Sequence, residues 1–469
     1  MMSSEHRAQR GAERDDNQAN QHGPPGLADL LPAWLPQQRW YGGKDSAITG
    51  VTVQSSVVLQ PGDPELHHMV VRATADNGST ADYQLLVGVR AHMPDRLDHA
   101  FIGPVGDRFA YDAAQDSETS AVLLSLIAED ATIGDLRFIP EPGAELDTSQ
   151  SSRVSSAEQS NTSLVYGESY ILKIFRRVTD GRNPDLEVHR ALASVGCRHI
   201  APPLGAIESA DPDVTYAMLQ EYVANAADGW HMATTSVRDL YAEADLHADE
   251  VGGDFAGEAT RLGEATARVH RDLAAVLGSR EAGPEQCRRT AQQMRDRLAA
   301  AMTIVPGLAP HAEGLRAAFD EVAGLTEPIR VQRVHGDFHL GQALRTMTGW
   351  VLIDFEGEPA RPIAERTEFM SPLRDVAGML RSFDYAARHL LSDHRREQHL
   401  EYRATEWAER NRDAFCAGYA EGAGEDPRKQ ATLLRAFELD KAVYEAVYEV
   451  RNRPTWLPIP LASIARLTG

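Results

Sequence analysis

The chain has 469 residues, of which 42% are hydrophobic and 25% charged. These values are typical of a globular protein with two to four domains and enough apolar side chains to bury their cores. The net charge of −22 at pH 7 argues against a nucleic-acid-binding protein, whose surface would be basic. Three widely spaced cysteines, Cys197, Cys287 and Cys416, form neither a disulfide framework nor a C-x-x-C metal pair, which favours a reducing cytoplasm.

The N-terminal third of the chain is polar at first and then rich in predicted strands. Residues 1–25 consist mostly of Ser, Glu, Arg, Asp, Gln and Asn, which predicts a disordered tail without the apolar core of a signal peptide. The longest apolar run, Val122 to Ala128, is too short to cross a bilayer, so we expect no membrane partner. Alternating and β-branched segments predict strands at 51–59, 68–73 and 83–89, followed by a helix at 117–128 and a strand at 136–139.

A Ser-rich stretch, residues 147–163, follows this region, and its composition predicts a linker or an exposed hairpin. Because a strand is predicted directly after it, its last residues fall at the tip of a β-turn-β unit. Hydroxyl and backbone N–H groups at such a tip could hold the oxygens of a triphosphate. The residues concerned are Ser160, Asn161, Thr162 and Ser163.

The strand I-L-K-I-F-R-R at residues 171–177 contains Lys173, on the face opposite Leu172 and Ile174. Such a lysine is either an ordinary surface residue or a ligand of nucleotide phosphates, steadied by a carboxylate from the following helix. That helix is predicted at 183–192, with Glu187 as the preferred partner of Lys173 and Asp185 as its competitor. A further strand at 216–223 would present backbone groups to adenine at its end, namely those of Glu221, Tyr222 and Val223.

Most of the remaining chain, residues 225–469, is predicted to be helical. A capping box formed by Ser236 and Asp239 predicts the start of one helix. His270 lies near the edge of an apolar helical stripe and is expected to be a hydrogen-bonded core histidine. Apolar periodicity and helix-start signals predict helices near 255–273, 286–302, 311–322, 371–385, 402–421 and 429–451.

Within this helical part, the segment from Arg330 to Pro359 contains most of the chemistry. A short strand, a turn at Gly336 and a polar loop deliver Asp337, and a second strand ends on Asp354. An isolated H-G-D is more often a turn in which Asp caps a backbone N–H. The spacing of Asp337, Gln342 and Asp354 instead favours a site for phosphoryl transfer, in which the protein positions the nucleophile and holds Mg²⁺.

In that interpretation the residues have separate roles. Asp337 accepts the proton of the attacking hydroxyl, and Asp354 binds the metal ion. Gln342 offers a neutral oxygen to the metal, and Glu356 a further carboxylate. Two alternatives remain open: a metallohydrolase, and a catalytically silent carbohydrate-binding protein. The first would use as its ligands His335, Asp337, His339 and Asp354.

The run H-G-D-F-H-L-G-Q followed by I-D-F-E-G-E-P resembles the catalytic loop and metal-binding segment of aminoglycoside and choline kinase-like phosphotransferases. It resembles more narrowly the actinobacterial maltokinases, in which Gln also replaces the usual Asn, here Gln342. The likeness extends from Trp34 to Leu467, through E-Q-S-N-T-S at 158–163 and E-L-D-K-A-V-Y-E at 438–445.

The resemblance implies an α+β, bilobal eukaryotic-kinase-like fold with an extra N-terminal cap subdomain and a mainly helical C-lobe. Residues 26–147 would form the cap and an intermediate β-rich subdomain. Residues 148–224 would form the nucleotide-binding part of the N-lobe, and residues 225–469 the C-lobe with the catalytic loop and sugar site.

The implied activity is ATP-dependent phosphorylation of maltose at its anomeric hydroxyl, which gives maltose 1-phosphate for α-glucan synthesis. ATP and Mg²⁺ would be the cofactors, and the enzyme would be a cytoplasmic monomer or a weak dimer. Related enzymes of similar architecture phosphorylate glucosamine instead, so another sugar is the alternative substrate.

The resemblance also implies a sugar pocket on the last long helix, lined by Lys441, Tyr444 and Glu445. A Lys and a Glu four residues apart are otherwise a common helix salt bridge. Three further residues are assigned to the substrate, namely His335, His339 and Arg374, and Asp375 is expected to support the catalytic loop.

Overall fold

The structure is a computed structural model that describes residues 23–44, 46–155, 160–210, 214–243, 246–358, 361–392 and 398–469. The tail predicted at 1–25 falls outside these residues except for its last three. The chain forms two compact units. The first contains the described residues up to 186 together with 202–224, and the second contains residues 187–201 and 225–469. None of the described helices is both long and apolar enough to cross a membrane.

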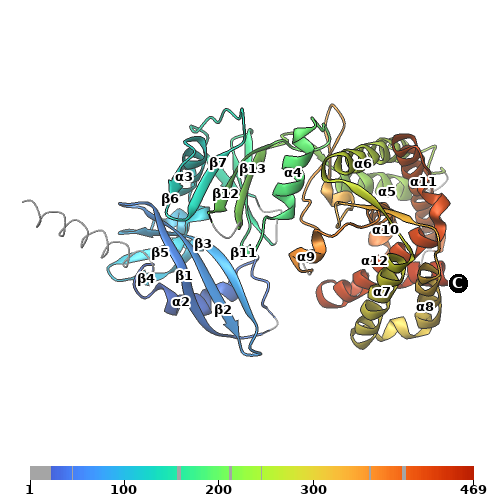
Figure 1. Cartoon of the computed structure of the whole chain (residues 1–469), viewed down its shortest axis with the longest axis horizontal. Helices are drawn as coiled ribbons and strands as arrows, with labels where there is room; N and C mark the ends of the chain where they lie inside the picture. The colour runs from blue at the N-terminus through green and yellow to red at the C-terminus, as the bar shows by residue number, and fades with distance from the viewer. Residues whose placement is uncertain are drawn as a thin grey trace, which may run out of the picture. The chain divides into compact units, whose positions relative to one another are not determined.

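The first unit begins with an antiparallel sheet in the strand order β1-β2-β3-β5-β4 (Figure 1). The strand predictions for this region are confirmed, although each strand is longer than expected. The helix α2 (Leu27–Trp34) contributes Leu27, Leu31 and Trp34 to the core beneath the sheet. The strands are β1 (Ile48–Gln60), β2 (Glu65–Ala75), β3 (Thr80–Arg90), β4 (Phe101–Val105) and β5 (Arg108–Asp112).

A second sheet of the same unit has the order β6-β7-β12-β13-β10-β9-β8. The helix α3 (Ser117–Ala128) packs against it and begins where predicted, because the side chain of Asp116 accepts a hydrogen bond from the backbone N–H of Glu118. The strands are β6 (Thr132–Ile133), β7 (Leu136–Pro140), β8 (Ser152–Val154), β9 (Thr162–Tyr166), β10 (Tyr170–Ile174), β12 (Pro203–Ser209) and β13 (Thr215–Glu221).

Two buried side chains connect the sheets of the first unit. Nε2 of Gln84, on β3, donates to the carbonyl oxygens of Phe175 and Tyr216. The guanidinium of Arg176 donates to the Asp112 carboxylate and to Oγ1 of Thr162, and it lies 4.8 Å from the ring centroid of Trp40. The short strand β11 (Arg177–Val178) then pairs with β3, so the chain that follows Lys173 is attached directly to the first sheet.

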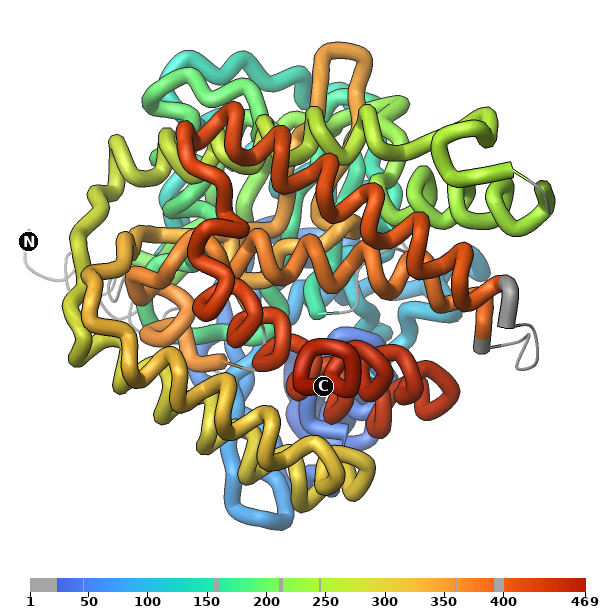
Figure 2. Tube along the Cα trace, turned by 90° about the vertical axis from the view of Figure 1, so that its right-hand side faces the viewer, coloured from blue at the N-terminus to red at the C-terminus, as the bar shows by residue number. Residues whose placement is uncertain are grey.

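The second unit is mainly helical and has one large apolar core. In Figure 2, α10 and α11 run beside each other as long orange and orange-red segments. Helices α6 and α11 approach closely because both carry glycines at the contact: a Cβ atom on Gly418 would lie 2.0 Å from the carbonyl oxygen of Thr260. The helices are α5 (Gly229–Ala242), α6 (Ala256–Leu277), α7 (Pro284–Ile304), α8 (Ala312–Ala323), α9 (Ile363–Arg366), α10 (Leu373–Arg388), α11 (Gln398–Ala423), α12 (Ala431–Asn452) and α13 (Pro458–Thr468). The division between the units falls within α4 (Pro184–Ser194).

The helix start predicted at Ser236 is wrong. Helix α5 begins at Gly229, after Asp228, whose side chain accepts from the backbone N–H of His231. Ser236 instead lies inside the helix, where its buried hydroxyl accepts a hydrogen bond from Nε1 of Trp407. The local pattern around Ser236 thus suggested a helix cap, but its hydroxyl is bound by Trp407, a residue distant in sequence.

Two small antiparallel sheets hold the catalytic segment within the helical unit. Strand β16 (Ile329–Gln332) pairs with β15 (Ser279–Ala282) and leads into the H-G-D sequence. Strand β17 (Ala343–Arg345) pairs with β18 (Trp350–Leu352) and with β14 (Ala227–Asp228). Asp337 and Asp354 thus follow the ends of β16 and β18, as predicted.

Candidate active site

The loop that carries Asp337 is held from below by the carboxylate of Asp375, in the first turn of α10. Oδ2 of Asp375 accepts the backbone N–H of His335 at 2.7 Å, and Oδ1 accepts that of Gly336 at 2.9 Å. Nε2 of His270 lies 2.9 Å from the same Oδ2. The expected supporting role of Asp375 is confirmed, and His270 is a hydrogen-bonded core histidine as predicted. What the sequence did not reveal is that His270 contacts the residue that supports the loop.

Glycines allow the segments of this site to approach each other. Gly336 has φ +88° and a Cβ atom placed on it would lie 3.3 Å from Cα of Gly357, which has φ +72°. A Cβ atom on Gly378, in α10, would lie 2.5 Å from the carbonyl oxygen of Phe338. Side chains at these positions would push the catalytic loop away from its neighbours, because backbone atoms cannot move aside as a flexible side chain can.

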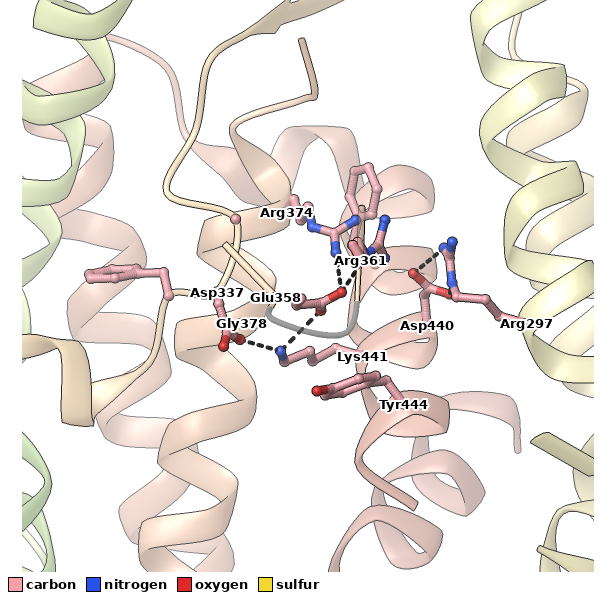
Figure 3. A pocket seen from close by; sticks show the side chains of 12 residues that line it. Arg297, Asp337, Glu358, Arg361, Arg374, Gly378, Asp440, Lys441 and Tyr444 are labelled. Atoms are coloured by element: carbon pink, nitrogen blue, oxygen red, sulfur yellow. Dashed lines mark hydrogen bonds and ion pairs between the residues drawn. The ribbon is translucent and has the colours of Figure 1, made fainter. Parts of the chain in front are cut away.

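Lys441, on α12, joins the catalytic loop to a buried carboxylate that follows β18 (Figure 3). Its Nζ atom lies 2.7 Å from Oδ1 of Asp337 and 3.2 Å from Oε1 of Glu358. The second oxygen of Glu358 lies 2.5 Å from Nε of Arg361 and 3.0 Å from Nη2 of Arg374. Glu358 is only 3% exposed and therefore needs this set of cations to remain charged inside the protein.

These charges determine the protonation states of the site. Burial raises the pKa of Asp337, but the positive charge and hydrogen bond of Lys441 outweigh burial and bring that pKa below its ordinary value. Burial also opposes ionisation of Lys441, yet Asp337 and Glu358 together raise its pKa. Asp337 is therefore an ionised carboxylate at neutral pH, as a base that accepts a hydroxyl proton must be.

A pocket beside Asp337 is lined by charged side chains from five segments of the second unit (Figure 3). The enclosed space is about 20 Å³, enough for one or two water molecules, because the paired side chains fill it. All three carboxylates of its wall are already paired with cations: Asp337, Glu358 and Asp440, the last at 2.5 Å from Nη2 of Arg297. The cations of the wall are Arg297, Arg361, Arg374 and Lys441.

Oxygen atoms suited to Mg²⁺ follow the catalytic loop. Nε2 of Gln342 donates to Oδ2 of Asp354 at 3.0 Å, which leaves the amide oxygen of Gln342 available as a ligand. Carboxylate oxygens of Asp354 and Glu356 lie within 4.8 Å of each other. Asp354 has φ +66°, a strained conformation for a residue with a side chain. The donor set is entirely oxygen, so these residues fit a hard divalent cation.

The structure corrects the assignment of His335 to the substrate. His335 is 2% exposed, its Nε2 donates to the carbonyl of Ile353 at 2.9 Å, and its ring packs between Phe338 and Phe355. It ties the catalytic loop to the strand that ends on Asp354 and has no open face for a ligand. Nδ1 of His339 accepts the backbone N–H of Gly341, so that ring also orders its own loop.

The other predicted sugar residues separate into two groups. Arg374, Lys441 and Tyr444 line the pocket, with the Tyr444 ring centroid 4.8 Å from Nζ of Lys441. Glu445 does not line it. Its carboxylate lies 2.7 Å from Nη2 of Arg381, within a buried charge network. Contrary to the prediction, Glu445 therefore does not line this pocket, because α12 turns its side chain toward α10.

In the first unit, the carboxylate beside Lys173 is Asp185 and not the expected Glu187. Nζ of Lys173 lies 2.9 Å from Oδ2 of Asp185, and both side chains are buried. Glu187 instead lies 2.6 Å from Nη1 of Arg333, a residue of the second unit, as Glu187 is itself. Asp185, the alternative named from the sequence, is therefore the partner of Lys173. Lys173 is buried and is not a surface lysine.

The Ser-rich hairpin is confirmed as the pair β8 and β9, and residues 156–159 lie outside the described part. Ser160 is exposed and Asn161 half-buried, whereas Thr162 and Ser163 are buried strand residues and not part of the tip. Oγ1 of Thr162 accepts from Arg176, so its hydroxyl oxygen is already engaged.

At the end of β13, two of the three predicted backbone donors are also engaged. The N–H of Glu221 donates to the carbonyl of Pro202, and that of Tyr222 to the carbonyl of Ser169. Within the described part of the chain the N–H of Val223 has no such partner. Val223 is therefore the donor that a purine base could use.

Sequence reasoning missed four charged residues of the pocket, Arg297, Glu358, Arg361 and Asp440. Glu358 lies in the quoted I-D-F-E-G-E-P run, so its position beside carboxylates predicted to bind a metal was a usable signal. Arg297 and Asp440 form an ion pair although 143 residues of sequence separate them. Arg361 belongs to the pocket wall because its side chain donates a hydrogen bond to Glu358. No local pattern marks such long-range pairs.

Residues 34–116 match the family model described as the maltokinase N-terminal cap domain. A glucosamine kinase from Streptacidiphilus jiangxiensis is 29% identical over 366 residues, which cover 74% of this chain and 81% of that protein. A glucosamine kinase from Mycolicibacterium smegmatis is 27% identical over 335 residues, covering 68% and 80%.

Solved structures of a glucosamine kinase have a similar fold. One crystal form superposes with a TM-score of 0.69 at 24% identity, covering 94% of this chain and 99% of the other. A complex with glucosamine, ADP and inorganic phosphate gives a TM-score of 0.68 at 23% identity, covering 95% and 99%. The prediction of an α+β kinase-like fold with a cap and a mainly helical C-terminal region is confirmed.

The fold is thus that of these kinase structures, and the H-G-D and I-D-F segments place Asp337 and Asp354 after two of its short strands. Through the matched cap domain and these relatives, the chain is similar to maltokinases and glucosamine kinases.

Proposed function

We propose that this protein is an ATP-dependent sugar kinase that phosphorylates the anomeric hydroxyl of maltose and forms maltose 1-phosphate, a donor for α-glucan synthesis. The matched maltokinase cap supports a sugar of this type. The observation that favours maltose over glucosamine is the charge of the pocket wall beside Asp337.

An ammonium group requires an unpaired carboxylate or an equivalent acceptor in its pocket. Asp337, Glu358 and Asp440 are each already paired, and four cations stand among the pocket residues. A protonated amino sugar would therefore meet net positive charge. A neutral sugar offers hydroxyl groups that both carboxylates and guanidinium groups can bind.

The proposed chemistry assigns one task to each group. Asp337 accepts the proton of the anomeric hydroxyl as that oxygen attacks the γ-phosphorus of ATP, and the bond from this phosphorus to the β–γ bridging oxygen breaks to release ADP. Gln342, Asp354 and Glu356 would hold Mg²⁺, which supplies charge neutralisation on the phosphates. Lys173, steadied by Asp185, would bind phosphate oxygens, and Val223 would offer its N–H to adenine. Because the pocket is filled by paired side chains, sugar hydroxyls would replace part of the Asp337 to Lys441 contact on binding.

A glucosamine kinase activity is the second candidate, because the two relatives described above carry that name. The metallohydrolase alternative gains no support, since the rings of His335 and His339 are directed to backbone groups. Among the described residues these histidines join no group that could hold a metal ion.

The deciding experiment is an ADP-release assay with ATP and Mg²⁺, run in parallel with maltose, glucose, glucosamine and no sugar. We expect ADP release with maltose to be far faster than with glucose, glucosamine or no sugar. Phosphorus NMR of the product should locate the phosphate on the anomeric carbon. If ADP is released with glucosamine and not with maltose, the proposed substrate is wrong, whereas the proposed roles of Asp337 and Asp354 remain. No release with any sugar would overturn the proposal.

A further inference from the structure

A second cavity lies between α6, α11 and the start of α10, apart from the pocket beside Asp337. We call it the α6–α11 cavity and define it by His270 and Arg271 on α6, Arg330 on β16, Ser371 before α10, and Tyr419 on α11. Its volume is about 150 Å³, which exceeds the room needed by several water molecules. Nothing in the proposed kinase reaction uses this space.

One wall of the α6–α11 cavity leads directly to the catalytic loop. Tyr419 and His270 both line it, and Oη of Tyr419 lies 2.9 Å from Nδ1 of His270. Nε2 of the same ring lies 2.9 Å from Oδ2 of Asp375, which accepts the backbone N–H groups of His335 and Gly336. In the tautomer that carries its proton on Nε2, the ring donates to Asp375 and its Nδ1 accepts the tyrosine O–H. Four hydrogen bonds thus connect the cavity to the residues that precede Asp337.

The charges around the cavity favour an anion. Arg271 and Arg330 are exposed, and neither guanidinium has a hydrogen bond or ion pair with another described residue. The N-terminal end of α10, the positive end of a 16-residue helix, also borders the cavity at Ser371. One carboxylate, Glu425, is present in the wall. The balance is positive, and two guanidinium groups with a hydroxyl match the oxygens of a phosphate group.

We propose that the α6–α11 cavity binds a phosphate group, and that its occupancy reaches the catalytic loop through Tyr419, His270 and Asp375. A phosphate oxygen near Tyr419 accepts the phenolic O–H in place of Nδ1 of His270. The His270 ring then loses one of the two hydrogen bonds that orient it, so Asp375 holds the catalytic loop less firmly. Turnover should fall without competition against either substrate of the kinase.

Binding is tested first, because this readout does not depend on activity. Inorganic phosphate and glucose 1-phosphate are titrated in separate arms into the full-length protein by calorimetry, which distinguishes a free phosphate site from a phosphomonoester site. We expect saturable binding of at least one of the two ligands. In the double variant Arg271→Gln, Arg330→Gln the affinity should fall about tenfold or more, because each lost charged hydrogen bond weakens binding by roughly tenfold. Equal affinity in this variant, or no saturable binding in either arm, would overturn the proposal.

The connection to the loop is tested by kinetics, and this part rests on the proposed kinase activity. The double arginine variant should retain the basal kcat and lose the non-competitive inhibition by phosphate. Tyr419→Phe should still bind phosphate through the two arginines. Its kcat should be lowered even without phosphate and should not fall further when phosphate is added, because it lacks the O–H that changes partner. Inhibition that is purely competitive with ATP and equal in all three proteins would contradict the connection, whereas absence of any kinase activity would instead count against the proposed function.

Discussion

The ammonium of Lys441 bridges two carboxylates that come from different segments: its Nζ atom lies 2.7 Å from Oδ1 of Asp337 and 3.2 Å from Oε1 of Glu358. The candidate base is thus held ionised by a cation that a third residue keeps in place. Because the three charges interact in a partly buried site, a change in any one should alter the strength of the base.

Replacement of Lys441 by Met should move the acid limb of the pH–rate profile to higher pH. Lys441 keeps the pKa of Asp337 below its ordinary value, so its removal raises that pKa and the base becomes protonated at a higher pH. The value of kcat/KM for the sugar should be measured from pH 4 to pH 9 in both proteins. A parallel loss of activity at every pH, with an unmoved acid limb, would show that Lys441 contributes only contacts.

Replacement of Glu358 by Gln should move the same limb in the opposite direction. The negative charge of Glu358 raises the pKa of Asp337, and without it Lys441 pairs with Asp337 alone. The base then stays ionised to lower pH but is weaker, so the plateau of kcat should fall about tenfold. Thermal unfolding followed by circular dichroism serves as the control, since Arg361 and Arg374 also lose their partner. A shift toward higher pH would contradict this account.

Replacement of Asp185 by Asn should raise the KM for ATP by about tenfold, as should Lys173→Ala, because the buried pair would no longer place the ammonium. Glu187→Gln is the matched control: it lies on the same helix and carries the same charge, but it pairs with Arg333. Its KM for ATP should change little. The reverse order of effects would restore the original assignment of Glu187.

Replacement of Asp354 by Asn should weaken metal binding with little change in the backbone, because Asn tolerates the positive φ of this position. Mn²⁺ binding measured by electron paramagnetic resonance should weaken about tenfold or more, and the Mg²⁺ needed for half-maximal activity should rise by a similar factor. Asp320→Asn, which removes an exposed carboxylate of α8, is the control. Equal Mn²⁺ affinity in both variants would place the metal elsewhere.

Replacement of Gly378 by Ala should reduce kcat strongly, by about a hundredfold, because the new Cβ atom would lie 2.5 Å from the carbonyl oxygen of Phe338 and displace the loop that carries Asp337. Gly257→Ala, on α6, is the matched control, since the atoms nearest its Cβ belong to the flexible side chain of Arg261. Normal kcat in the Gly378 variant would mean that the loop position is not critical.

Some of the site could be predicted from sequence because its parts are local. Asp337, Gln342 and Asp354 belong to one continuous strand-loop-strand segment, and within it the side chain of Gln342 reaches Asp354. The strands of the first unit and the long helices could also be predicted from sequence, because turn residues mark their ends and apolar residues recur with the period of a strand or a helix.

The tertiary structure decided the contacts between segments that are distant in sequence. Lys441 reaches Asp337 across 104 residues, and only the packing of α12 against α10 determines that Lys441 and Tyr444 border the pocket while Glu445 meets Arg381. Asp185 and Glu187 are two residues apart and equally acidic, so the choice of partner for Lys173 depended on the direction in which each side chain leaves α4. Sequence thus determined which chemical groups are available and where the chain turns. Their partners, and hence their charges and roles, were decided by folding, because Coulombic and hydrogen-bond energies depend on distances that no local pattern encodes.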